Sequence, residues 1–329
     1  MSEQYQVSVS PHITSPESIP RIMWTVNITL IPAGIASVYF FGIPALFVII
    51  SSLAGAALSE YLWQIVFKKP STISDGSAVL TGLLLAYNIP PGVPLWLPFV
   101  GSAFSIIIAK MIFGGLGCNV FNPALVGRAF LLASWPQLMT TWWKASMNPL
   151  ALDGVTTATP LGILKEEGWG KLIEAFGTKA ALYSSLWWGN RAGSLGETCT
   201  VLLLLGGIYL IFRGYINWQL PLSYIATVGI FAWVFGPNGA FTGDPVFHIM
   251  AGGLIIGAFY MATDMVTIPL TLPGRIIFGV GAGIITILIR LKGGYPEGVC
   301  YSILLMNAVT PYIDRKLKPK KYGFAETKR

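Results

Sequence analysis

One polar segment, Asp153-Gly154-Val155-Thr156-Thr157-Ala158-Thr159-Pro160, interrupts a chain otherwise dominated by apolar runs. Asp153-Gly154 is a turn signal, and Thr159-Pro160 has the form of a helix N-cap followed by the first helical residue. Backbone N–H groups at a helix start are unpaired, and together with the helix dipole they stabilise an anion. The Thr159 hydroxyl is therefore a candidate position for an esterified phosphate, although a turn and a capped helix alone would explain the same residues.

Further polar residues fall within or at the ends of apolar runs: Glu60, Asp75, Asn88, Asn122, Arg128, Glu197, Asp264 and Asn307. Charges within a membrane are costly and generally face the interior of a bundle or water. For Glu60, Asp75 and Glu197 we expect helix ends at the membrane interface. Arg128 and Asp264 leave two interpretations open, a structural role or a cation pathway or cofactor contact. Asn122 precedes a proline and fits a helix cap or the same pathway.

The possible metal ligands are few. The chain has three cysteines, Cys118, Cys199 and Cys300, none of them in a CxxC pair, and two histidines, His12 and His248. This set argues against a four-ligand zinc or iron–sulfur site within this chain alone. We expect the cysteines to be small buried hydrophobic residues.

The elements that must position these groups are membrane-spanning helices. Of 329 residues, 54% are hydrophobic and 11% charged, against about a quarter charged in a typical soluble domain. At about 20 apolar residues per span, the length fits roughly ten spans. The sequence thus predicts an all-α integral membrane protein, with an aromatic belt explaining Trp135, Trp142, Trp143, Trp187 and Trp188. The apolar runs lie near 22–41, 43–64, 77–89, 94–113, 119–137, 196–212, 216–236, 246–263, 274–291 and 297–313.

The distribution of basic residues predicts the orientation. With ten spans and both termini in the cytoplasm, the inside segments hold Arg21, Lys68, Lys69, Lys110, Arg213, Arg275 and the seven basic residues of the tail. The short outside loops then hold only Arg290 and Lys292, as the positive-inside rule favours. The loop at 138–195, with the threonines, lies outside. The net charge of +7 is scattered apart from the tail, which argues against nucleic-acid binding.

The two halves of the chain resemble each other weakly. "LTGLLLAYN" (80–88) is similar to "AGGLIIGAF" (251–259), and 114–130 aligns with 293–309 without gaps. Five spans per half would invert the second half, an architecture typical of transporters with a site near the midplane. We expect a cytoplasmic segment at 1–21, five-helix repeats at 22–137 and 196–313, the extracytoplasmic loop at 138–195 between them, and a basic cytoplasmic tail at 314–329.

The order Asp153, Thr156, Ala158, Thr159 resembles the flavin-transfer motif Asp-x-x-Ser/Thr-Gly-Ala-Thr, with Thr157 where glycine is usual. In that motif the last threonine carries FMN through a phosphoester bond. The departure at Thr157, the following Pro-Leu and four further blocks resemble one family. It comprises the D subunit of the Rnf ferredoxin:NAD⁺ oxidoreductase complex and the B subunit of the Na⁺-translocating NADH:quinone reductase. The blocks are 74–91, 114–130, 263–271 and 293–314.

The resemblance implies two inverted five-helix repeats similar to urea and ammonium channels, in a bacterial or archaeal cytoplasmic membrane. It implies FMN on Thr159, Asp153 and Thr156 guiding a flavin transferase and lining the phosphate beside Ala158, and a second, non-covalent riboflavin. The complex passes electrons between ferredoxin and NAD⁺ and pumps Na⁺ or H⁺, with flavoprotein, iron–sulfur and NAD-binding subunits as partners. The alternatives are a urea/ammonium-type solute channel or transporter without a flavin, and a structural scaffold.

Overall fold

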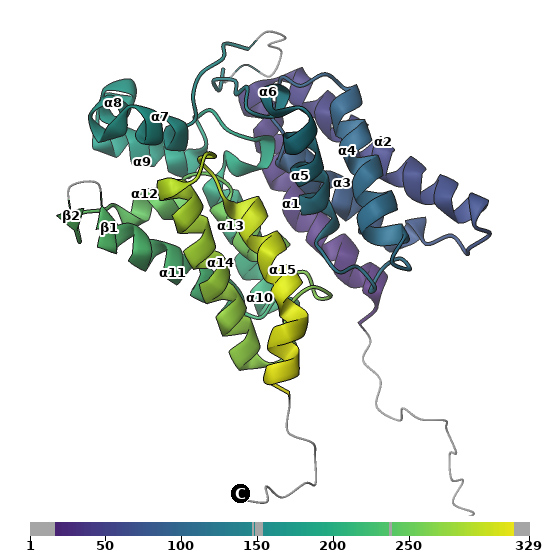
Figure 1. The fold of residues 1–329 in the computed structure, drawn as a ribbon. Helices are drawn as coiled ribbons and strands as arrows, with labels where there is room; N and C mark the ends of the chain where they lie inside the picture. Colours follow the sequence, from purple (N-terminus) through teal and green to yellow (C-terminus); the bar gives the residue numbers. More distant parts are fainter. Residues whose placement is uncertain (1–16, 147, 149–153, 237–238, 319–329) are drawn as a thin grey trace, which may run out of the picture.

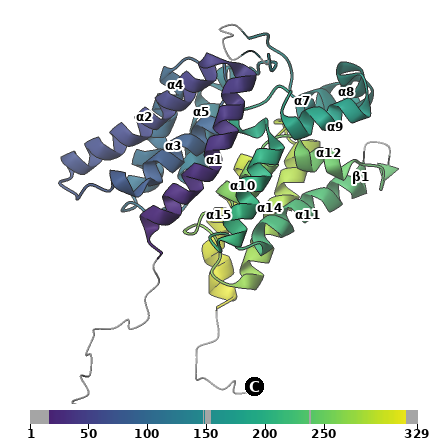
Figure 2. The same cartoon turned by 180° about the vertical axis from the view of Figure 1, so that it is seen from behind.

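The computed structural model describes residues 17–146, 148, 154–236 and 239–318. Asp153 and His12 lie outside these residues. The fold is mostly helical, with two groups of apolar helices side by side and a set of short helices across one end (Figure 1, Figure 2). Large apolar side chains cover the outside of both groups, including Ile35 and Phe212, as expected for helices in lipid.

The first group follows the chain order of the first five predicted spans. Its first helix is capped by Ser18, which accepts a hydrogen bond from the Arg21 N–H, with Pro20 in the first turn. The elements are α1 (Ile19–Phe41), α2 (Ile43–Val66), η1 (Ile73–Asp75, a 3₁₀ turn), α3 (Ser77–Tyr87), α4 (Trp96–Ile106), η2 (Ile107–Met111, a π-helical turn) and α5 (Pro123–Ser134).

The second group corresponds to the last five predicted spans. It includes a two-stranded antiparallel hairpin in which Phe235 pairs with Ala240. The elements are α10 (Thr200–Phe212), α11 (Gln219–Val234), β1 (Phe235–Gly236), β2 (Gly239–Ala240), α12 (Pro245–Met250), α13 (Leu254–Ile256), η4 (Gly257–Met261, a π-helical turn), α14 (Leu272–Lys292) and α15 (Val299–Lys316).

A helix lies within each of the ten predicted runs, but the run at 246–263 is wrong as a continuous helix. Gly252 has a φ of 68°, a left-handed conformation that favours glycine, and the helix is broken there into α12 and α13. The Arg290 guanidinium of α14 donates to the freed carbonyls of His248 and Ala251, at 2.5 and 3.1 Å. Among the described residues, three helices are long and apolar enough to cross a membrane, α1, α2 and α14.

The long loop between the groups contains short helices. Gly168, with a φ of 83°, separates α7 from α8. The apolar side of these helices packs on protein, because Leu161, Leu172 and Leu186 form a small core with Phe247 of α12. The elements are α6 (Pro136–Met139), α7 (Pro160–Glu166), α8 (Gly168–Phe176), α9 (Lys179–Trp188) and η3 (Leu195–Glu197, a 3₁₀ turn).

The two groups meet where interrupted helices end. Asn88, at the end of α3, donates to the Met261 sulfur at 3.6 Å, and Asn122, before α5, donates to the Met261 carbonyl at 3.0 Å. The start of α1 and the end of α15 lie at one end of the molecule, and α7, α8 and α9 lie at the other (Figure 1, Figure 2). This end with the short helices contains the threonine segment.

Candidate functional site

The threonine segment is held by a neighbouring backbone stretch. Lys144 N donates to the Val155 carbonyl at 2.8 Å, and Thr157 N donates to the Trp142 carbonyl at 2.9 Å. The side chain of Trp143 lies against the backbone of both Gly92 and Gly154. A Cβ atom at either glycine would come within 2.2 Å or 2.0 Å of the indole. The Trp143 side chain and the Trp142 backbone therefore anchor this loop.

Thr159 is the N-cap of α7, as the sequence predicts. Its hydroxyl oxygen accepts a hydrogen bond from the Gly162 N–H at 3.1 Å, and its carbonyl accepts from Ile163 N at 2.9 Å. Thr156, Thr157 and Ala158 are exposed, whereas Thr159 is only 7% exposed. The cap thus fixes the hydroxyl in one place at a buried edge of the segment.

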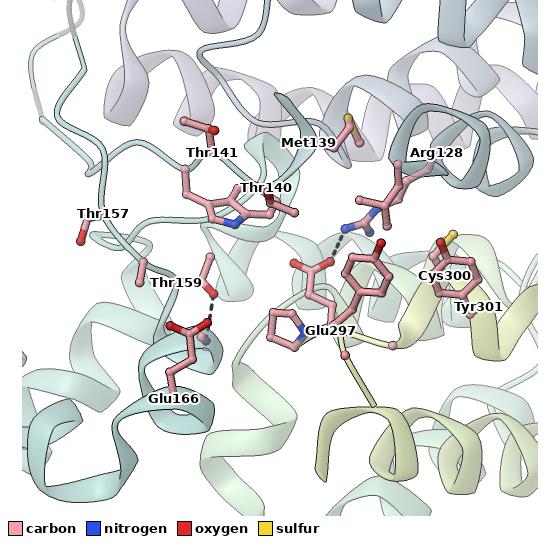
Figure 3. Close-up of a pocket in the computed structure, with 18 of the residues that line it drawn as sticks. Arg128, Met139, Thr140, Thr141, Thr157, Thr159, Glu166, Glu297, Cys300 and Tyr301 are labelled. Atoms are coloured by element: carbon pink, nitrogen blue, oxygen red, sulfur yellow. Dashed lines mark hydrogen bonds and ion pairs between the residues drawn. The ribbon is translucent and has the colours of Figure 1, made fainter. Parts of the chain in front are cut away.

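A cavity of about 640 Å³ opens beside this hydroxyl (Figure 3). The threonine segment and α7 form one side. The opposite side is formed by α5, the loop before α15 and the start of α15. Aromatic walls come from Trp142, Tyr295 and Tyr301, and hydroxyls come from Thr140, Thr141, Thr156 and Thr157.

Arg128 lies across the cavity from Thr159. Its guanidinium donates to the Glu297 carboxylate and, at 2.7 Å, to the Asn88 side-chain oxygen, and it lies 3.8 Å from a carboxylate oxygen of Glu197. Figure 3 shows the Arg128–Glu297 pair on the side of the cavity away from Thr159. Arg128 therefore lines the cavity from the side opposite Thr159.

Glu197 is buried behind this cavity, so its expected place at the membrane interface is wrong. It shares a void of about 10 Å³, about the size of one water molecule, with Thr159, Arg191 and Glu297. The Arg191 guanidinium donates to the Glu197 carbonyl at 2.5 Å. Arg290 donates to the Glu297 carbonyl at 3.1 Å. Three arginines thus surround two glutamates.

Asn122 and Asp264 lie together elsewhere. They line a cavity of about 100 Å³ between the two groups, with Lys110. Asn122 caps α5 by accepting from Leu125 N at 3.3 Å, and the Asp264 carboxylate accepts from Asn119 at 3.0 Å. Of the three residues predicted for an ion path, the structure brings these two together and separates them from Arg128.

Glu60 is likewise buried rather than at the interface, since it is 0% exposed. Its carboxylate accepts hydrogen bonds from Lys110 at 2.6 Å and from Thr72 at 2.7 Å. Lys110, on the π-helical turn η2, also donates to Ser77. Asp75 lies at a helix end, as expected, because it is the last residue of η1, and its carboxylate accepts a hydrogen bond from Ser77 N at the start of α3, at 2.7 Å.

Two charged residues of these clusters, Arg191 and Glu297, were not singled out from the sequence, and Lys110 was counted only as a basic residue on the cytoplasmic side. Glu297 carried a signal, because it stands in the block 293–314 on which the family resemblance rests. Arg191 lies in the long loop, and the positive-inside rule carries little information for basic residues in long loops. The cysteine expectation holds for Cys199 and Cys300 and is wrong for Cys118, which is exposed.

Helices of this composition, with a threonine-edged cavity at one end, define a helical membrane protein with a candidate small-molecule site. Residues 6–323 match the NQR2, RnfD, RnfE family, and the chain belongs to that family.

Curated relatives are similar over nearly the whole chain. It is 58% identical over 320 residues to the D subunit of the proton-translocating ferredoxin:NAD(+) oxidoreductase complex of Clostridium ljungdahlii, covering 97% of this chain and 96% of the relative. It is 45% identical over 323 residues to the D subunit of the Na(+)-translocating ferredoxin:NAD(+) oxidoreductase complex of Acetobacterium woodii, covering 98% and 96%. The D subunit of the ion-translocating oxidoreductase complex of Stutzerimonas stutzeri is 38% identical over 329 residues, covering 93% and 92%.

Proposed function

We propose that this chain is the D subunit of an ion-translocating ferredoxin:NAD⁺ oxidoreductase complex and that Thr159 carries FMN through a phosphoester. In this role it relays electrons within the membrane, and it also holds the non-covalent riboflavin that the resemblance implies. The proposal rests on the family and on one observation: the final threonine of the motif is fixed at the edge of the cavity of about 640 Å³. Cavities of roughly 300–1,000 Å³ suit ligands of this size.

The charges around Thr159 fit a phosphodiester. Arg128 pairs with the carboxylates of Glu197 and Glu297, while Arg191 and Arg290 donate to the backbone carbonyls of the same two glutamates. Three positive charges thus lie near two negative ones in the buried cluster, which leaves one positive charge in excess. A phosphodiester brings one negative charge, and burying a charge costs least when an opposite charge lies near it. Glu166 also lines the cavity, but it is exposed, so solvent screens its charge.

The chain's own residues have defined roles in this proposal. Gly162 N–H and the arginine cluster stabilise the phosphate, while Trp142, Tyr295 and Tyr301 offer apolar faces to a planar ring. FMN, when bound, supplies the electron-transfer chemistry. Thr156 and Ala158 line the same cavity, which is compatible with the roles that the resemblance implies for the motif.

We further propose ten membrane spans in two inverted repeats, 22–137 and 196–313, with both termini cytoplasmic and the threonine loop outside. Helices in all ten runs support this topology. The start of α1 and the end of α15 lie at the same end of the molecule, which also supports it (Figure 1). The contacts between halves also support it. Asn122, before α5, reaches the end of η4, and Glu297, before α15, reaches Asn88 at the end of α3 through Arg128.

An ion path at Asn122 and Asp264 remains a proposal, and Arg128 is now assigned to the cofactor cavity instead. Both residues line the cavity of about 100 Å³ between the halves, where a carboxylate and two asparagine side chains offer oxygen ligands. Oxygen ligands suit Na⁺, and a carboxylate can also exchange H⁺.

The Thr159→Asn variant tests the cofactor site. Asparagine caps helices as well as threonine but has no hydroxyl to esterify, so α7 should remain folded while covalent flavin is lost. The measurement is flavin fluorescence of the denatured chain in a gel, together with mass spectrometry of the peptide that contains residue 159. Thr157→Ala, in the same segment but exposed, is the matched control and should retain fluorescence.

Undiminished fluorescence in Thr159→Asn would overturn the site. An unmodified wild-type peptide, with solute flux through the isolated protein in liposomes, would favour the urea/ammonium-type channel instead.

A further inference from the structure

A second cavity, of about 590 Å³, lies on the other side of α7 from the Thr159 cavity. Helix α7 contributes Gly162 and Glu166 to the first cavity and Leu161, Leu164 and Lys165 to the second. The apolar walls of the second cavity come from four helices and comprise Leu161, Leu164, Trp169, Phe231, Ile287, Leu288 and Leu291.

One wall of this second cavity continues into the lipid-facing surface. Leu288 and Leu291 line the cavity and are 52% and 37% exposed. They lie on α14, which is long and apolar enough to cross a membrane. An apolar chain from the surrounding bilayer can therefore enter the cavity from its side without crossing water.

The polar end of the cavity is cationic. Lys165 and Lys292 line it, and among the described residues neither of them forms an ion pair with a carboxylate. The Lys165 ammonium donates to the backbone carbonyls of Gly293 and Tyr295. The acid that lines the cavity, Asp244, is already paired with Lys179 at 3.1 Å.

A buried histidine adds an unsatisfied polar group. His248 lines the cavity and is 7% exposed, and its Nδ1 atom has no hydrogen-bond partner among the described residues.

We propose that this cavity binds one anionic diacyl phospholipid. An acyl chain lies against α11 and α14, and the phosphate lies between Lys165 and Lys292. The segregation of apolar walls from cations matches an amphiphile rather than free phosphate, and the excess of positive charge selects an anionic over a zwitterionic headgroup.

The test uses the purified complex in nanodiscs of phosphatidylcholine with increasing phosphatidylglycerol. Lipids retained per complex are quantified by native mass spectrometry after transfer to detergent. Wild type should retain phosphatidylglycerol in preference to phosphatidylcholine. Lys165→Gln with Lys292→Gln should weaken retention about 25-fold, or about five-fold per lysine. Lys171→Gln, on α8 but outside the cavity, is the control and should change nothing.

A second variant keeps the test independent of charge. Leu288→Trp adds bulk at an exposed position of the wall and should reduce retention of the same lipid. Equal retention of both lipids, or unchanged retention in the lysine variant, would overturn the proposal. Displacement of the lipid by inorganic phosphate would also overturn the proposal, as would a cavity filled by another subunit of the complex. Covalent flavin on Thr159 should persist in every variant, so this inference and the flavin site fail separately.

Discussion

At the scale of single residues, local hydrogen-bonding chemistry was predictable and long-range partners were not. Ser/Thr/Asn caps act within three residues, and the caps at Thr159 and Asn122 are both where the sequence places them. The pair Arg128–Glu297 joins residues 169 positions apart, so no local pattern could reveal it. For the same reason Glu197 was wrongly expected at the membrane interface.

Asp244 is a residue whose environment predicts a pH effect outside the membrane. Burial is the largest influence on its pKa and raises it. Hydrogen bonds from Tyr183 and from Phe247 N, with the nearby Lys179 ammonium, outweigh burial and hold the pKa below its usual value. Because the folded pKa is depressed, the stabilisation is present above the ordinary pKa and is lost as the pH falls through the folded pKa.

We therefore expect the melting temperature to fall as the pH drops below about 4. Since Lys179 is mostly exposed, this contribution is roughly 0.5–1 kcal/mol. Asp244→Asn keeps a helix cap but should lack this component of the pH dependence. Differential scanning fluorimetry from pH 6 to pH 3 measures it, with Glu174→Gln, in an exposed pair, as the control. Identical pH profiles for Asp244→Asn and wild type would contradict the assignment.

At the scale of elements, hydropathy located the helices but not their interruptions. Averaged over 246–263 the sequence is apolar, and the break at Gly252 depends on donors from Arg290, which belongs to α14. The position of η2 depends in the same way on a distant partner, because Lys110 bonds Glu60 of α2, 50 residues earlier. Element positions follow from composition, whereas the irregular turns follow from tertiary contacts.

The buried Lys110–Glu60 pair gives a prediction for η2. Lys110→Met should leave a carboxylate buried without its cation, at a cost of about 3–5 kcal/mol. Adding Glu60→Gln removes the charge while keeping an acceptor for Thr72, so the double variant should recover most of the loss. Thermal unfolding of the detergent-solubilised protein measures both.

The exposed pair Lys171–Glu174 is the matched control for this cycle. Lys171→Met and Glu174→Gln should each change stability by less than about 1 kcal/mol. If Lys110→Met were as mild as Lys171→Met, the buried pair would not hold η2 against α2.

At the scale of the whole molecule, labelling of the Cys118 thiol tests the proposed membrane orientation. Cys118 is exposed between η2 and α5, while Cys199 and Cys300 are buried. The positive-inside rule places Cys118 on the cytoplasmic side and the threonine loop on the other. A membrane-impermeant maleimide should label Cys118 several-fold faster in inside-out than in right-side-out vesicles.

The reciprocal probe is Val155→Cys in a Cys118→Ala background. Val155 is 73% exposed in the threonine segment, so labelling should now favour right-side-out vesicles. Both thiols should react fully after solubilisation in detergent. The same labelling preference at both positions would place them on one side of the membrane and contradict the proposed topology. Reversal of both preferences would invert it.

The pairing of Arg128 with Glu297 also bears on how the chain folds. Arg128 comes from α5 in the first half, while its carboxylate partners, Glu197 and Glu297, come from the second. If the two halves were separated, Arg128 in the first half would keep only the neutral Asn88 as a side-chain partner among the residues that it contacts here. In the second half, the carboxylates of Glu197 and Glu297 would lose their contact with Arg128. This cluster therefore couples the folding of the two halves, and we expect that neither half can be exchanged as an independent module even though their helices follow the same order.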